Sequence, residues 1–260
     1  MIIIILGVGP VTIDIYGTDH YEPRRGVEQT MLLEVIATTV SDAVTAERYG
    51  ADRIELITAF GEGGLTPSLG LIEAVREKVA IPVRVMVRPH ARSFIYDASD
   101  AETMLRDIRH IAGVGGLSLV MGMLRENHTI DEELLTRLLE QAEGMEVTFH
   151  RAFDEVQDQL EALEFLKRYP QITDILTSGG TAAATTPGGM VRLAVLERLS
   201  AGSSVSILAG SGLNAAALKD FITRTGVRRV HFGSAVREDG DPLKPVDPKR
   251  LEAVCKILKP

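Results

Sequence analysis

From Met31 onward, short apolar runs alternate with longer segments in which apolar residues recur at helical spacing. The short runs predict β-strands and the longer segments predict helices. Alternating strands and helices are typical of a parallel sheet, and eight such units in about 230 residues match the size of a (β/α)₈ (TIM) barrel. The predicted strands are Leu32–Ala37, Arg53–Ile57, Val83–Arg88, Leu117–Gly122, Glu146–Arg151, Asp174–Ser178, Ser206–Gly210 and Arg229–Gly233.

A predicted helix follows each strand. The loops after the second and third strands, AFGEGGLTPS and PHARSFIYDASD, are long. Because chemistry in this fold lies where the strands end, these loops are expected to border a functional site. The predicted helices cover residues 41–50, 68–79, 101–112, 131–143, 157–169, 190–200 and 214–225, with a last helix after Pro248.

Residues 1–30 do not continue this pattern. The run MIIIIL is much shorter than the roughly 20 residues of a membrane helix, and it lacks the positive region of a secretory signal. The segment is either an added strand or arm, or an upstream extension of a protein that naturally starts at Met31. We favour the extension, because eight units suffice to close a barrel. The expected organisation is an extension over residues 1–30 and one barrel domain over residues 31–260.

Composition narrows the classes of partner. The 260 residues are 45% hydrophobic and 25% charged, which is ordinary for a soluble globular protein. The net charge is −8 and no block of Lys or Arg occurs, so neither nucleic acid nor a membrane is expected as a partner. The single cysteine, Cys255, rules out an internal disulfide and fits a reducing cytoplasm.

Alternation along each strand predicts which side chains face the barrel axis. Within Val83–Arg88 the three valines form one apolar set suited to packing under the helices. The residues between them, including Arg88, then face the axis. The same alternation in the other strands adds Glu34, Glu55, His150 and His231 to the axis.

Such charged groups are unusual in a barrel interior, which branched apolar residues normally fill. Buried charges must pair with one another or serve a ligand. One interpretation is an ion-pair network that plugs the barrel, and the other is a ligand site with shifted pKa values. We favour the ligand site, and we expect Arg84 and Arg229, nearer the strand starts, to be structural. The candidate catalytic residues are Glu34, Glu55, Arg88 and His150.

Glycine-rich loops follow the last three predicted strands, with the sequences TSGGT, AGSGL and FGSA. Small residues expose backbone N–H groups, and many barrels bind phosphate after strands 7 and 8. The alternative is that these glycines only serve tight turns. The candidate anion-binding residues are Ser178, Gly179, Gly180, Gly210, Ser211, Gly212, Gly233 and Ser234.

The motifs ADRIEL, EGGLTPS, VTFHRAFD and LTSGG occur in this order. With them, residues 31–234 resemble the CutC family, which is named for copper homeostasis. The resemblance implies a cytoplasmic (β/α)₈ barrel, a homo-oligomer and a role in copper handling, since some members bind Cu(I). The polar residues of the family motifs are all present here, namely Glu34, Glu55, Arg88, His150, Arg151 and Asp154.

The chain departs from the family where copper would bind. Many relatives carry cysteines late in the first strand and at the end of the second, where this chain has Ile36 or Ala37, and Ile57. Cu(I) prefers thiolate or thioether ligands, which isoleucine cannot supply. Cys255 lies in the last predicted helix and is expected to fill the core, and core filling is also expected of the methionines near strand ends. No metal ligand is therefore assigned.

Three functions fit these observations. The first, taken from the resemblance, is copper binding and homeostasis. The second is an enzyme acting on a small anionic or phosphorylated metabolite, with Glu34 or Glu55 as general base, His150 as general acid and Arg88 as an anion clamp. The third is a non-catalytic sensor that uses the same pocket. The residues favour the second, and turnover would distinguish it from the third.

Overall fold

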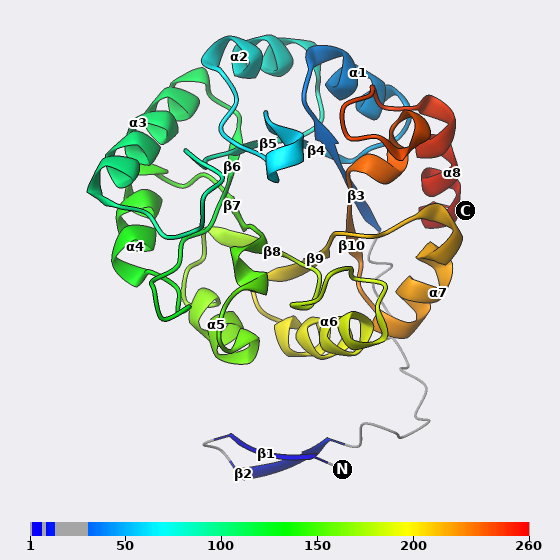
Figure 1. Ribbon diagram of the computed structural model, residues 1–260. Helices are drawn as coiled ribbons and strands as arrows, with labels where there is room; N and C mark the ends of the chain where they lie inside the picture. The colour runs from blue at the N-terminus through cyan, green and yellow to red at the C-terminus, as the bar shows by residue number, and fades with distance from the viewer. Residues whose placement is uncertain (1, 7–8, 14–30, 260) are drawn as a thin grey trace.

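The computed structural model describes residues 2–6, 9–13 and 31–259. Eight parallel strands close into a barrel in the order β10-β3-β4-β5-β6-β7-β8-β9, which confirms the predicted (β/α)₈ fold (Figure 1). Each strand pairs with its sequence neighbour, and β10 closes the ring by pairing with β3. The strands are β3 (Leu32–Ala37), β4 (Arg53–Leu56), β5 (Val83–Met86), β6 (Ser118–Met121), β7 (Val147–Phe149), β8 (Ile172–Thr177), β9 (Ser206–Ala209) and β10 (Arg229–Phe232).

Helices surround the barrel (Figure 1). Side-chain caps determine where several of them begin. The third helix begins three residues before the predicted start, because Asp97 caps it and Asp100 completes a capping box. Thr186 likewise caps the sixth helix ahead of a proline in its first turn. The helices are α1 (Val40–Arg48), α2 (Leu69–Lys78), α3 (Ala98–Val114), α4 (Glu132–Gln141), α5 (Gln159–Leu166), α6 (Pro187–Ser200), α7 (Ala215–Thr225) and α8 (Pro248–Leu258).

The main core lies between the strands and the ring of helices. Val83, Val85 and Val87 are buried there, as the alternation predicted, and so are Met121 and Met123. A second, small apolar cluster fills part of the barrel interior, and its buried members are Ile36, Ile57, Met86 and Val120. The predicted division between helix-facing and axis-facing residues is therefore confirmed.

Strands β1 (Ile2–Leu6) and β2 (Gly9–Ile13) pair antiparallel in a two-stranded sheet of their own, and the barrel sheet closes without them. Residues 14–30 lie outside the described residues, so the expectation that residues 1–30 form an extension stays a prediction. Within the described residues, no helix combines the length and apolar character needed to cross a membrane.

Candidate active site

An ion-pair layer occupies the barrel near the starts of the strands. The carboxylate of Asp174 on β8 accepts hydrogen bonds from Arg53 Nη1 at 3.1 Å and Arg229 Nη1 at 2.7 Å, and Arg84 Nη2 lies 2.9 Å from it. Burial alone raises the pKa of Asp174, but the three guanidinium groups outweigh burial and hold it below its usual value. The expectation that Arg84 and Arg229 are structural agrees with this layer.

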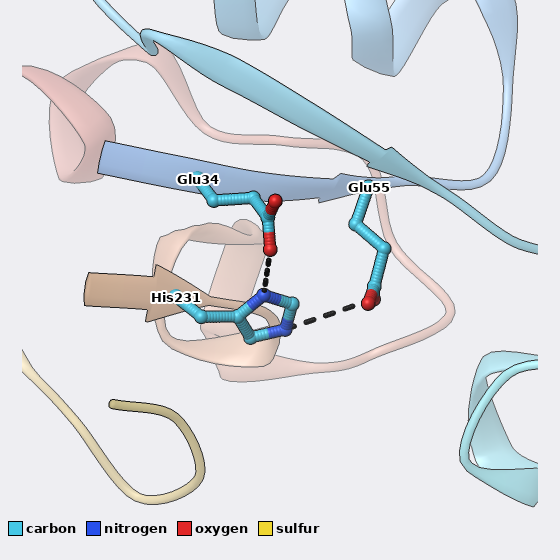
Figure 2. A group of neighbouring side chains, drawn as sticks. All are labelled: Glu34, Glu55 and His231. Carbon is cyan, nitrogen blue, oxygen red and sulfur yellow. Dashed lines mark hydrogen bonds and ion pairs between the residues drawn. The ribbon is translucent and has the colours of Figure 1, made fainter. Parts of the chain in front are cut away.

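Above this layer lies a relay of two carboxylates and one imidazole (Figure 2). Glu34 on β3 accepts a hydrogen bond from Arg53 Nε at 2.5 Å, and its other oxygen lies 2.8 Å from His231 Nδ1. Burial alone raises the pKa of Glu34, but Arg53 and His231 outweigh burial and lower it to about 2. Burial lowers the pKa of His231, whereas Glu55 and Glu34 raise it above its usual value. Glu34 therefore stays ionised and holds His231 in place.

Glu55 on β4 is the least satisfied member of the relay. Its Oε2 lies 3.7 Å from His231 Nε2, and its Oε1 is buried with no hydrogen-bond partner among the described residues. Desolvation raises the pKa of Glu55 to about 7, with Glu34 adding to the rise while His231 and Arg53 oppose it. A carboxyl group with a pKa near 7 can accept or donate a proton at neutral pH.

The relay could also be considered as a metal site. Single ligand atoms of Glu34, Glu55 and His231 lie within 4.8 Å of one another. However, the Glu34 carboxylate is already paired with Arg53 and with His231 Nδ1. Only Glu55 and His231 Nε2 remain as donors, fewer than the three protein ligands of a typical catalytic zinc site. The arrangement fits proton transfer better than metal coordination.

His150 follows β7 and caps the 3₁₀ helix Arg151–Asp154. Its Nδ1 lies 3.1 Å from the backbone N of Ala152, and its Nε2 is buried without a partner among the described residues. Burial, followed by the charge of Arg88, lowers the pKa of His150 to about 3. At neutral pH His150 is therefore an uncharged hydrogen-bond donor.

Arg88, just beyond β5, does not pair with the glutamates. Its Nη1 donates to the carbonyl oxygens of Glu62 and Gly64 at 3.0 and 3.2 Å, in the loop after β4. Its guanidinium carbon lies 4.7 Å from the centre of the Phe94 ring, and its Nε is buried without a partner among the described residues. The partner of Glu34 is instead Arg53, one layer lower.

A cavity of about 280 Å³ opens where the strands end. Glu55, Arg88 and His150 line it, as does His231, whereas Glu34 lies outside its lining. Three of the four candidate catalytic residues thus meet at one cavity, and the fourth supports it through His231. The cavity walls also contain Phe60, Phe94 and Arg151, which the sequence reasoning did not place there.

The loop after β8 is not an open anion site, contrary to expectation. Its backbone N–H groups at Ser178 and Gly180 donate to the carboxylate of Asp154 at 3.0 Å each, and the N–H of Gly179 donates to Thr177 Oγ1 at 2.9 Å. The sequence shows a glycine-rich loop, but it does not show that Asp154 already fills it. These three N–H groups are thus already hydrogen-bonded, and the loop is left out of the anion site proposed below.

The loops after β9 and β10 face the cavity. Ser211, Gly212, Gly233 and Ser234 line it, whereas Gly210 instead packs against His231, where an added Cβ would lie 3.3 Å from the ring. The backbone N–H groups of Ser211 and Gly212 have no acceptor among residues 31–259. Both residues have positive φ angles of 72° and 73°. These two loops remain the candidate anion site.

The donors expected for Cu(I) are missing from this cavity. Ile36 and Met86 contribute to its wall, and Ile57 packs with them in the small interior cluster. Met86 is a single thioether, and Cys255 lies on α8 with its Sγ 3.1 Å from the Tyr49 carbonyl oxygen. The residues present do not fit a Cu(I) centre, because that ion prefers several sulfur ligands.

The sequence reasoning missed two kinds of residue. Asp174 and Arg53 were not singled out, although alternation from Glu55 would have placed Arg53 on the axis. Phe94 covers both Arg88 and His150, with its ring 4.7 Å from the His150 ring. It lies in an irregular loop, where no periodic signal could have indicated its position.

The fold and the site together define a (β/α)₈-barrel protein with a buried acid–base pocket at the carboxyl ends of its strands. A family model described as the CutC family matches residues 31–236. A CutC family protein of Enterobacter sp. strain 638 is 40% identical over 214 residues, covering 82% of this chain and 83% of the relative. Another from Caulobacter vibrioides strain NA1000 is 40% identical over 219 residues, covering 84% and 85%. The chain belongs to the CutC family.

Solved structures agree with this assignment. The provisionally named copper homeostasis protein CutC of Streptococcus agalactiae superposes with a TM-score of 0.72 at 28% identity, covering 78% of this chain and 98% of that one. The phosphoribosyl anthranilate isomerase of Thermococcus kodakaraensis gives a TM-score of 0.57 at 16% identity, covering 88% of this chain and 99% of that one. This second likeness concerns the fold alone.

Proposed function

We propose that this protein is an enzyme that transfers a proton on a small anionic metabolite bound in the cavity. One observation carries the proposal: Glu55 Oε1, Arg88 Nε and His150 Nε2 are all buried without a partner among the described residues, and all belong to residues that line one cavity. Buried polar atoms are nearly always hydrogen-bonded in folded proteins. Seven such side-chain atoms occur among the described residues, and three of them belong to residues around this one cavity, which supports a ligand there as the missing partner.

The size and charge of the cavity restrict the ligand. A volume of about 280 Å³ lies just below the range of drug-sized pockets, so the ligand is a small metabolite. Arg88 supplies positive charge on the β5 side, whereas Arg151 is already paired with Asp154 at 2.8 Å. The free N–H groups of Ser211 and Gly212 supply hydrogen-bond donors on the opposite side. Both features favour an anion, and the loops after β9 and β10 suit a phosphate.

Glu55 is the general base in this proposal. Its raised pKa, about 7, makes it a stronger base than an ordinary carboxylate and leaves a substantial ionised fraction at neutral pH. His231 lies beside it and takes its orientation from the ionised Glu34. Glu34 is therefore a positioning residue, because it acts through His231.

Copper binding is the function that the family name suggests, and the donor set of this chain argues against it. A sensor that binds the same ligand without turnover would use the same polar groups. A raised pKa on Glu55 favours the enzyme, because a binding site alone does not need a group poised to exchange protons at neutral pH.

The experiment begins with native mass spectrometry of the full-length protein to detect a small molecule that co-purifies with it. That compound is then identified and incubated with the wild type, with Glu55→Gln and with Glu197→Gln. Glu197 on α6 is a matched control, because burial raises its pKa to about 7 and it does not line the cavity. Consumption by the wild type and by Glu197→Gln, but not by Glu55→Gln, is expected. Binding without consumption by the wild type would contradict an enzymatic function.

A further inference from the structure

The His150 ring is held in one orientation and one tautomer. The backbone N–H of Ala152 donates to Nδ1, so the neutral ring carries its proton on Nε2. The Phe94 ring covers it at 4.7 Å. Behind the ring lies Gly122, where an added Cβ would be 2.5 Å from Nδ1, so only glycine lets the backbone pass this close. The Nε2–H group is therefore a fixed donor.

This donor is also uncharged. Burial disfavours the imidazolium, and Arg88 and Arg151 oppose a further positive charge nearby, so the pKa of His150 falls to about 3. A neutral imidazole polarises a substrate oxygen through its N–H and does not act as a proton source at neutral pH. Its unpartnered Nε2 marks where that oxygen would be bound.

Glu55 supplies a proton acceptor in the cavity that His150 supplies with a neutral hydrogen-bond donor. It comes from β4 and His150 follows β7, so the two groups reach the cavity from different parts of the barrel. Glu55 Oε1 lacks a partner, as does His150 Nε2. One cavity thus contains an unpaired base and an unpaired neutral donor, the two kinds of group that proton removal next to a carbonyl requires.

We infer that the reaction is the reversible removal of a proton from a carbon next to a carbonyl group, with Glu55 as the base and the His150 Nε2–H group bound to the carbonyl oxygen. This inference rests on the proposed function and names its substrate class: a small ketone or aldehyde that carries a phosphate or carboxylate. Isomerases and epimerases of such compounds are the reaction types that this arrangement serves.

The step balances within the site. The C–H bond breaks, its proton passes to a Glu55 oxygen, and its electron pair forms the C=C bond of an enolate. The former carbonyl oxygen takes up the negative charge, which the His150 N–H group stabilises. Glu55 then returns the proton to the same carbon. Where that carbon carries a hydroxyl group, the hydroxyl proton can first pass to the former carbonyl oxygen, and Glu55 then protonates the former carbonyl carbon, so that the carbonyl and hydroxyl groups exchange places. No oxidant, reductant or second substrate is consumed.

The test follows proton exchange with solvent by ¹H NMR. The full-length protein is incubated in D₂O with dihydroxyacetone phosphate, ribose 5-phosphate and 2-oxoglutarate in separate samples. Saturation-transfer signals in the same samples report which compound binds, and loss of C–H signal reports exchange. We expect at least one compound both to bind and to exchange deuterium faster than without protein.

Three variants assign the roles. Glu55→Gln is expected to bind the same compound but to lower the exchange rate by about 10²- to 10⁴-fold, the range for loss of a general base. His150→Gln is expected to lower kcat by about 10²-fold with little change in KM, as for loss of one oxyanion donor. Glu197→Gln should keep the wild-type rate. All are purified identically, so a contaminating isomerase would be equally active in every sample.

The outcomes separate the inference from the proposed function. A compound that binds but does not exchange would overturn the inference and leave the anion-binding cavity intact. Exchange that persists in Glu55→Gln would also overturn it. If none of the three compounds binds, the substrate class named here is contradicted, whereas the proposed function is still decided by the compound that co-purifies with the protein.

Discussion

Replacing Glu55 by glutamine should stabilise the protein above neutral pH while it abolishes activity. Glu55 Oε1 has no partner among the described residues, and desolvation raises the pKa of Glu55 from 4.5 to about 7. The folded protein therefore holds the neutral acid at a pH where the unfolded chain already carries a carboxylate. Glutamine keeps the shape of the neutral acid and cannot ionise.

The sign and size of this stability change follow from the linkage between protonation and folding. Because the folded pKa is higher than the unfolded one, the contribution of Glu55 is fully present below pH 4.5 and is lost as pH rises to about 7. The shift from 4.5 to about 7 is 2.5 pKa units. At about 1.36 kcal/mol per unit, the wild type should lose about 3 kcal/mol relative to the variant across this window.

Urea unfolding of both proteins between pH 4 and 9 measures this difference. The free energy of unfolding of the variant minus that of the wild type should rise by about 3 kcal/mol between pH 4.5 and 7 and stay constant above. In thermal melts, this corresponds to roughly 6–12 °C for a domain of this size.

A difference that does not change with pH would refute the reasoning, because it would mean that Glu55 titrates normally. Glu197→Gln serves as the control, since burial raises the pKa of Glu197 to about 7 as well. It should change the pH dependence in the same direction but leave catalysis unchanged. Only at Glu55 should the gain in stability coincide with loss of activity, as expected for a buried active-site carboxylate.

Four further predictions follow from the same contacts. Asp174→Asn should cost about 3–5 kcal/mol in urea unfolding, because it removes the charge that three buried or half-buried arginines share, and a loss below 1 kcal/mol would contradict the ion-pair layer. Gly122→Ala should lower catalysis more than stability, because its Cβ would lie 2.5 Å from His150 Nδ1; unchanged kinetics would show that the ring position is unimportant. In competition with a Cu(I) chelator, the wild type should bind little Cu(I), whereas Ile57→Cys should bind it more tightly because it adds a thiolate. Tight Cu(I) binding by the wild type that this variant does not improve would contradict the conclusion that the Cu(I) ligands are missing. Removing residues 1–30 should shift the melting temperature by only a few degrees, about 1 kcal/mol, and an unfolded truncated protein would show that they are structural.

Local patterns in the sequence were enough for the fold and for the orientation of the side chains. The alternating valines of Val83–Arg88 predicted which residues face the axis, because adjacent side chains of a strand point to opposite faces whatever surrounds it. Eight repeats of strand and helix predicted the closed barrel, because consecutive parallel strands need a helical crossover between them. Helix starts were less accurate, because capping at Asp97 and Thr186 depends on backbone geometry beyond the apolar period.

Only the tertiary structure decided which charges pair and which stay free. Arg53 reaches Asp174 across 121 positions of the chain, a partner that barrel closure selects and no local pattern reveals. The glycine-rich loops after β8 and β9 look alike in sequence, yet Asp154 fills the first and leaves the second open. The pKa of Glu55 likewise depends on desolvation by residues from several strands, and desolvation exists only once the barrel has closed.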